Sequence, residues 1–242
     1  MATRMYMPTA QSAPSTTFPI NSNWNSVCEN AVYQPLAITI PAVDRVSGEY
    51  TFLVSESDPA IHDQLCGQWI SPPLLAQTIS GSISGIWSPR EANSAYDFGT
   101  QVSMRVCDYY GTLTRGTLLS PFTYTTTVAT AGIGNREFPS AGSNLTRFLP
   151  GGGGPIPLAL NVQLGDRIVW EIGARATNLI ATTRTADPRL QLRSDWSDAA
   201  WVEGTSGSGV NHWIEFTDDL TFDPDYDPAV DAVPFVGWGV PI

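Results

Sequence analysis

Apolar and polar residues alternate along two stretches of the sequence, and this period of two constrains the fold more than any other feature. In residues 101–110 the apolar positions of one face are Val102, Met104 and Val106. In residues 165–178 they are Ile168, Trp170 and Ile172. Successive side chains of a strand point to opposite faces, so both stretches predict strands with one buried face. No window shows a sustained helical period.

Short β-prone segments lie between turns rich in glycine, proline and asparagine. They are residues 36–40, 50–54, 79–87, 122–129, 145–149, 190–192 and 213–216. The run 149–157 holds four glycines between prolines and predicts a loop, because no Lys-Ser/Thr or helix follows it to bind phosphate. This pattern predicts an all-β fold, an antiparallel β-sandwich or jelly-roll-like domain over residues 36–216.

The two ends of the chain differ in composition from this domain. Residues 1–35 contain four prolines and many Ser, Thr and Asn residues, which exclude a helix. Residues 217–242 are acidic and then apolar. We interpret both as extended arms, with disorder of residues 1–35 as the alternative. The expected assembly anchors, which would fill pockets on neighbouring subunits, are Tyr6, Phe18, Trp24, Phe235 and Trp238.

The charge balance excludes several classes of partner. The net charge is −11, and all 12 basic residues are arginines. An acidic chain repels nucleic-acid backbones and anionic membrane surfaces. The absence of lysine excludes P-loop and Schiff-base chemistry. The first residues do not resemble a signal peptide, and no apolar stretch approaches the roughly 20 residues of a membrane span.

Residues that could carry chemistry stand outside any recognisable catalytic motif. No nucleophile motif accompanies His62, which we expect in a short helical turn, or His212, which we expect in a turn before a strand. The candidate carboxylates for glycoside hydrolysis are Asp166, Glu171, Asp195, Asp198, Glu203 and Glu215. Because Glu171 and Glu215 lie within predicted strands, we expect them to face outward or to meet an arginine across the sheet.

Metal sites are weakly indicated. Cys28, Cys66 and Cys107 stand far apart and predict buried thiols rather than a zinc site. Asp223, Asp225 and Asp227 are spaced like the first ligands of a calcium loop, but proline follows where such a loop needs glycine. An irregular calcium site and a solvated acidic connector both remain open. We expect no catalytic residue, no cofactor and no metal.

Several segments resemble uncharacterised proteins encoded in tailed-phage and prophage genomes. The opening TRMYMP (3–8) is similar to their TRLYLP-type start. Further similar segments follow in the same order, at residues 75–85, 115–119, 135–139, 165–178 and 213–216. The resemblance implies a virion protein that decorates the head or is attached to the tail, and it brings no catalytic residues. Residues 217–242 depart from the pattern.

The sequence therefore predicts a structural component of a bacteriophage virion, made in the host cytoplasm. The first hypothesis is a capsid decoration (cement) or minor capsid protein that binds coat subunits and forms homo-oligomers. The alternative is a tail-associated protein that binds host glycan, and a glycan-degrading enzyme is the third hypothesis. Expected partners are other virion proteins, without direct nucleic-acid or membrane contact.

Overall fold

The computed structural model is built from strands. It describes residues 1–7, 18–20, 22, 24–38, 48–51, 54–55, 62–87, 89–90, 98–123, 147–149, 156–176, 185–186, 189–192 and 212–226. These residues contain no helix, and nearly all of their strand pairs are antiparallel. The predicted all-β fold is confirmed, while the β-sandwich or jelly-roll arrangement stays a prediction.

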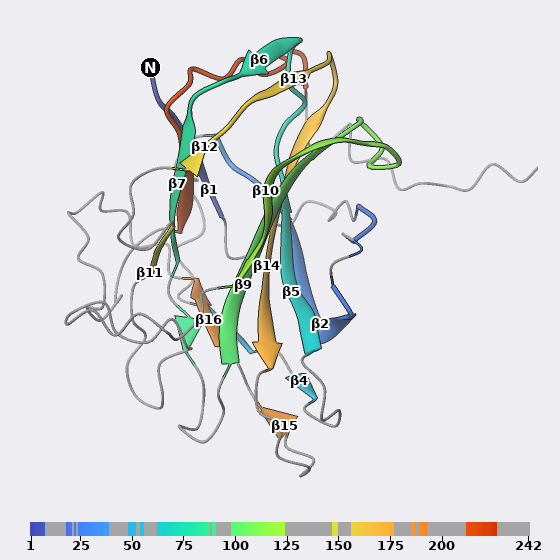
Figure 1. Ribbon diagram of the computed structural model, residues 1–242, viewed down its shortest axis with the longest axis vertical. Helices are drawn as coiled ribbons and strands as arrows, with labels where there is room; N and C mark the ends of the chain where they lie inside the picture. The colour runs from blue at the N-terminus through green and yellow to red at the C-terminus, as the bar shows by residue number, and fades with distance from the viewer. Residues whose placement is uncertain are drawn as a thin grey trace, which may run out of the picture.

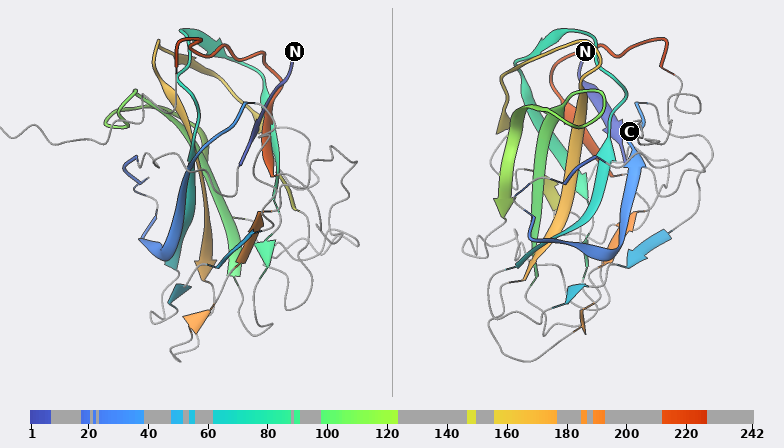
Figure 2. Two further views of the ribbon diagram at one scale, coloured as in Figure 1. Left: turned by 180° about the vertical axis from the view of Figure 1, so that it is seen from behind. Right: turned by 90° about the vertical axis from the view of Figure 1, so that its right-hand side faces the viewer.

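Two five-stranded sheets form the body of the protein (Figure 1). The first, here the β14 sheet, has the order β10 (Thr114–Thr123), β9 (Phe98–Cys107), β14 (Arg167–Ala176), β5 (His62–Ile70) and β2 (Ser26–Pro35). Strand β2 runs parallel to β5, and the other neighbours are antiparallel. Figure 2 shows the strands of this sheet side by side in its right-hand view.

The second sheet, here the β17 sheet, contains the first and the last described strands. Its order is β1 (Thr3–Tyr6), β17 (Trp213–Phe216), β7 (Ser82–Trp87) and β11 (Arg147–Leu149), and β12 (Ile156–Pro157) also pairs with β7. Smaller pairings join β13 (Leu160–Val162) to β6 (Gln77–Ile79) and β15 (Thr185–Ala186) to β4 (Val54–Ser55). A three-stranded sheet has the order β3 (Gly48–Thr51), β16 (Arg189–Leu192), β8 (Pro89–Arg90).

One hydrophobic core receives side chains from both large sheets. The β17 sheet contributes Met5, Ile83, Ile214 and Phe216. The β14 sheet contributes Trp69, Val102, Met104, Val106, Ile168, Trp170 and Ile172. The apolar faces predicted for residues 101–110 and 165–172 are therefore confirmed. Alternation leaves the other face of the β14 sheet to the intervening, mostly polar side chains.

Strand β1 belongs to the β17 sheet and is not part of an arm outside the domain. It pairs with β17 in a register that sets Met5 opposite Ile214, and Met5 is fully buried in the core. Strand β2 likewise belongs to the β14 sheet. The predicted boundary at residue 36 is wrong for these two segments, because their backbones form sheet hydrogen bonds with strands of the domain.

Residues 217–226 also pack against the domain. Leu220 is buried, and Phe222 lies against the same core and forms a β-bridge with Leu74. This part of the predicted C-terminal arm is held by the body of the protein. The remainder of that predicted arm, residues 227–242, lies outside the described residues.

Candidate functional site

A cluster of polar side chains is buried on the outer face of the β14 sheet, away from the hydrophobic core. Its centre is Glu171 of β14, which is fully buried. The sheet register sets Glu171 directly beside Gln68 of β5 and Ser103 of β9, and Arg105 lies two residues further along β9. Alternation along β9 and β14 thus brings a carboxylate, an amide, a hydroxyl and a guanidinium to one face.

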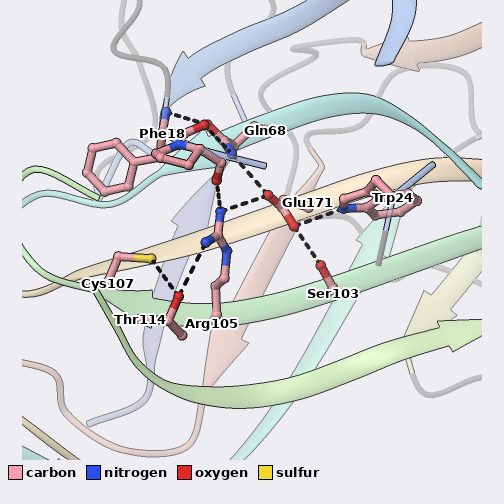
Figure 3. Close-up of polar contacts among 9 residues, drawn as sticks. Phe18, Trp24, Gln68, Ser103, Arg105, Cys107, Thr114 and Glu171 are labelled. Atoms are coloured by element: carbon pink, nitrogen blue, oxygen red, sulfur yellow. Dashed lines mark hydrogen bonds and ion pairs between the residues drawn. The ribbon is translucent and has the colours of Figure 1, made fainter. Parts of the chain in front are cut away.

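The Glu171 carboxylate accepts hydrogen bonds from four side chains of the described residues (Figure 3). Its Oε1 accepts from Arg105 Nη2 at 3.1 Å and from Gln68 Nε2 at 3.0 Å. Its Oε2 accepts from Ser103 Oγ at 2.8 Å and from the indole Nε1 of Trp24 at 2.9 Å. A carboxylate offers about four acceptor positions, so these donors fill it.

Two short pieces of the N-terminal segment, residues 18–20 and 24–25, lie over this cluster, and we call them the strap. The Phe18 amide donates to Gln68 Oε1 at 2.9 Å, and Gln68 Nε2 also approaches the Phe18 carbonyl oxygen at 3.3 Å. The Arg105 guanidinium donates to the carbonyl oxygen of Pro19. The cluster therefore bonds to the strap through backbone groups as well as through Trp24.

Aromatic side chains of the strap fill space that glycines leave open. A Cβ atom on Gly173 would lie 2.3 Å from the Trp24 ring and 2.2 Å from a backbone oxygen of β5. A Cβ atom on Gly111, where φ is +72°, would lie 2.5 Å from the Phe18 ring. Phe18 also packs on Ile70, Cys107 and Val169. The sheet surface is thus shaped to receive this one segment of the chain.

The ion pair at the centre is almost completely removed from water. The side chains of Arg105 and Glu171 are 5% and 0% exposed, and their charged atoms lie 3.1 Å apart. Burying two charges costs several kcal/mol each, which only good geometry and further hydrogen bonds offset. The neighbouring donors supply those hydrogen bonds. Chemically, the arrangement is suited to fixing the strap on the sheet.

Tyr6, Phe18 and Trp24 make their contacts inside the chain. All three are at most 8% exposed, and Trp24 also bonds to Glu171. The prediction that they fill pockets on a neighbouring subunit is wrong for this conformation, because the chain's own sheets already cover them. The other two predicted anchors, Phe235 and Trp238, lie outside the described residues.

The two histidines have different outcomes. His62 opens strand β5, so the predicted helical turn is wrong there. His212 immediately precedes β17, and its ring is buried with no hydrogen-bond partner for either nitrogen among the described residues. Burial lowers the pKa of His212 to about 3, so the imidazole is neutral at ordinary pH. A neutral, enclosed ring is a packing element here.

Three of the candidate carboxylates form ion pairs with arginine. Glu171 pairs with Arg105 across the sheet, and Glu215 of β17 lies 2.8 Å from Arg4 of β1, which confirms that expectation for both strands. Asp166 is buried in the turn before β14 and lies 3.1 Å from Arg115.

The remaining acidic candidates do not come together in a site within the described residues. Asp195, Asp198, Glu203 and Asp227 lie outside them. The Asp223 carboxylate accepts a hydrogen bond from the Asp225 amide, and this contact lies within one turn. In the described part of the chain, no three His, Cys, Asp or Glu residues are grouped to hold a metal ion, and no helix could span a membrane.

Sequence reasoning did not single out Arg105, Gln68, Ser103 or the stack around Arg167. The Arg167 guanidinium lies between two tyrosine rings, 4.4 Å from the centre of Tyr109 and 4.8 Å from that of Tyr226. The signal for Ser103 and Arg105 was the polar face of residues 101–110 beside a glutamate in a second predicted strand, whereas Gln68 lies in β5, which the sequence does not indicate. The stack has no local signal, because Tyr226 is distant in sequence.

Comparisons with known proteins add no argument about function. No protein-family model and no curated protein matches the chain. Among solved structures it is similar to a CocE/NonD family hydrolase from Staphylococcus aureus, with 7% identity and a TM-score of 0.38. That match covers 92% of this chain and 35% of the hydrolase, so the chain spans about a third of its length. A similarity of this strength supports neither a shared activity nor a shared fold.

Proposed function

We propose that this chain is a structural component of a tailed-bacteriophage particle rather than an enzyme. In its specific form the proposal is a capsid decoration, cement or minor capsid protein that binds neighbouring coat subunits. The observation that carries the structural role is the Glu171 carboxylate, whose two oxygens accept from four side chains. A carboxylate bound in this way holds the chain together and presents no open acceptor to a substrate.

The attribution to a phage is supported by the resemblance of several sequence segments to phage proteins. Residues 3–8 include β1, residues 75–85 include β6 and the start of β7, and residues 165–178 include β14. The similar segments therefore fall on strands that build both large sheets. Similarity in the strands that build the fold is expected of structural proteins that assemble through surfaces of complementary shape. The net charge of −11 favours partners with basic surfaces.

The test is the composition of purified particles. We expect the protein in density-gradient-purified virions of its phage, at a copy number above that of a tail-tip protein and, for a decoration or cement protein, comparable with that of the major coat protein. Quantitative mass spectrometry of whole particles measures that ratio. Complete absence of the chain from infectious, purified particles would contradict the proposal.

A tail-associated, glycan-binding protein is the second candidate, and one exposed aromatic residue favours it. Tyr110 is 66% exposed and meets Tyr109 edge to face, with ring centres 5.1 Å apart. An exposed aromatic face is a surface on which a sugar ring stacks. This candidate predicts few copies per particle and binding to host glycans that Tyr110→Ser abolishes. Copy number and a glycan array separate the two candidates.

A further inference from the structure

Three turns meet at one end of the β14 sheet, and a buried arginine joins them. They are residues 108–113 between β9 and β10, residues 163–166 before β14, and residues 223–226 after β17. The Arg167 guanidinium stacks between Tyr109 of the first turn and Tyr226 of the third. A Cβ atom on Gly165 of the second turn would lie 3.9 Å from Tyr109. We call this end the turn surface.

Internal hydrogen bonds fix the shape of the turn surface. The Asp108 carboxylate accepts from the Leu113 amide at 3.0 Å and from the Thr112 hydroxyl at 2.8 Å. The Asp166 carboxylate accepts from the Gln163 amide at 2.8 Å. The Asp223 carboxylate accepts from the Asp225 amide at 3.0 Å. Each turn is therefore held by its own carboxylate and does not depend on a partner for its form.

Burial of Arg167 between these turns costs free energy. The residue is only 4% exposed, and its buried Nε has no hydrogen-bond partner in the part of the chain that the structure describes. Leaving a buried donor unsatisfied costs about 1–3 kcal/mol, which stacking on two aromatic rings offsets in part. What this arrangement achieves is a fixed position of the first turn relative to the third.

The fixed turns expose large apolar side chains. Leu164 is 68% exposed, Tyr110 66% and Leu113 52%. Apart from Met1, these are the three most exposed large apolar side chains among the described residues. Single exposed apolar residues are normal on a protein surface, but several on preorganised neighbouring turns are typical of an interaction site.

The charges of the turn surface are unbalanced. Asp108, Asp223 and Asp225 form no salt bridge within the described residues. Burial alone would raise the pKa of Asp108, but the Leu113 amide and the Thr112 hydroxyl hold it below its usual value, so the group is ionised. The nearby arginines compensate only in part, because Arg115, which also lowers the pKa of Asp108, is paired with Asp166, and Arg167 is buried.

We propose that the turn surface is the part of this protein that docks on a neighbouring coat protein, in an apolar pocket rimmed by lysine or arginine. This inference rests on the proposed virion function and adds to it the contact surface and the chemistry of the partner. The exposed apolar side chains fill the pocket, and the unpaired carboxylates meet its rim. A second copy of the same acidic surface would repel the first, so self-association through this end is disfavoured.

The test measures incorporation of variants into particles. A phage that lacks the gene for this chain is grown in cells that supply the wild-type chain, the variant Y110S/L113S/L164S or the control V27S/I38S. The control removes two exposed apolar side chains far from the turn surface in sequence. Mass spectrometry of purified particles then gives copies per coat subunit, and thermal melts of the isolated proteins establish that each variant is folded.

We expect the turn-surface variant to lose at least about tenfold in copies per coat subunit, which corresponds to about 1.4 kcal/mol. The control should match the wild type. The added variant D225R should reduce incorporation as well, because it reverses one rim charge. If the triple variant melts early, the single variants Y110S and L164S are scored in the same way.

The outcomes separate the two proposals. Absence of the wild-type chain from particles refutes the virion function itself. Normal incorporation of a folded turn-surface variant, with the wild type also present, overturns the docking inference and leaves the virion function standing. If that folded variant incorporates normally but loses binding on a glycan array, the turn surface is a sugar site and the docking inference is likewise overturned.

Discussion

Removing the charge of Arg105 should destabilise the protein strongly. In Arg105→Met an unbranched apolar side chain replaces the stem of the arginine without its guanidinium, so Glu171 stays fully buried and loses its cation. The carboxylate then retains three donors, from Gln68, Ser103 and Trp24. Removing one partner of a buried ion pair costs about 3–5 kcal/mol, a large share of the 5–15 kcal/mol that stabilise a typical domain.

A double-mutant cycle with Glu171→Gln isolates the pair. The single variant Glu171→Gln leaves Arg105 buried without its counter-charge, so a loss of similar size is expected. The double variant removes both charges, and its loss should fall below the sum of the two by about 0.5–3 kcal/mol. The free energy of unfolding is measured by urea titration, followed by tryptophan fluorescence and circular dichroism at neutral pH.

Arg4→Met is the matched control on the other sheet. Its ion pair with Glu215 is 29% and 28% exposed, so water screens it and the expected loss is about 1 kcal/mol or less. A loss below about 1 kcal/mol for Arg105→Met, or strict additivity in the cycle, would show that the strap does not seal this pair from water.

Three further predictions concern the core, one histidine and the N-terminal segment. Trp170→Ala should cost about 3–5 kcal/mol in urea melts, because its side chain is fully buried between the sheets; a loss under 1 kcal/mol would place it elsewhere. Burial lowers the pKa of His212 from its usual 6.5 to about 3 in the folded protein, so the unfolded chain binds the proton more tightly and stability falls as the pH drops below 6.5. Between pH 7 and pH 5 this group should account for a loss of about 2 kcal/mol that His212→Phe does not show; equal pH dependence in both proteins would mean that His212 is hydrated or paired. Deleting residues 2–24 should abolish the cooperative melt, because it removes β1 from a sheet and uncovers Glu171; a truncated protein that melts like the full chain would show that these residues are dispensable.

The sequence was most informative where a strand has one apolar and one polar face. Strands β9 and β14 are of this kind, and both the buried face and the pairing of Glu171 with an arginine could be predicted. Strand β5 could not, because residues 63–70 are buried on both faces and their sequence does not alternate. Its Asp-Gln-Leu start after an Asp-Pro pair therefore favoured a helical turn that the structure does not contain.

The N-terminal segment was misjudged for a different reason. Its prolines and small polar residues indicate an extended chain, and the described parts are indeed extended, but local composition does not reveal what covers them. Tyr6 pairs with Trp213 of β17 as well as with Ala37, and Trp24 bonds to Glu171 of β14, so two of these partners lie far along the sequence. Which side chain meets Glu171 likewise depends on the sheet register, which is a tertiary property.

The pairing of β1 with β17 has a consequence for how the protein is made. Arg4 and Glu215, which meet across these strands, are 211 residues apart, so β1 leaves the ribosome long before its partner exists. Until residues 213–216 emerge, the backbone groups of β1 and the apolar side chain of Met5 lack their native neighbours in β17. Closing such a long loop is slow and exposes strand edges to wrong pairing. The β17 sheet can therefore be completed only after residues 213–216 have been made, and a chain that stops before residue 213 lacks the strand with which β1 pairs.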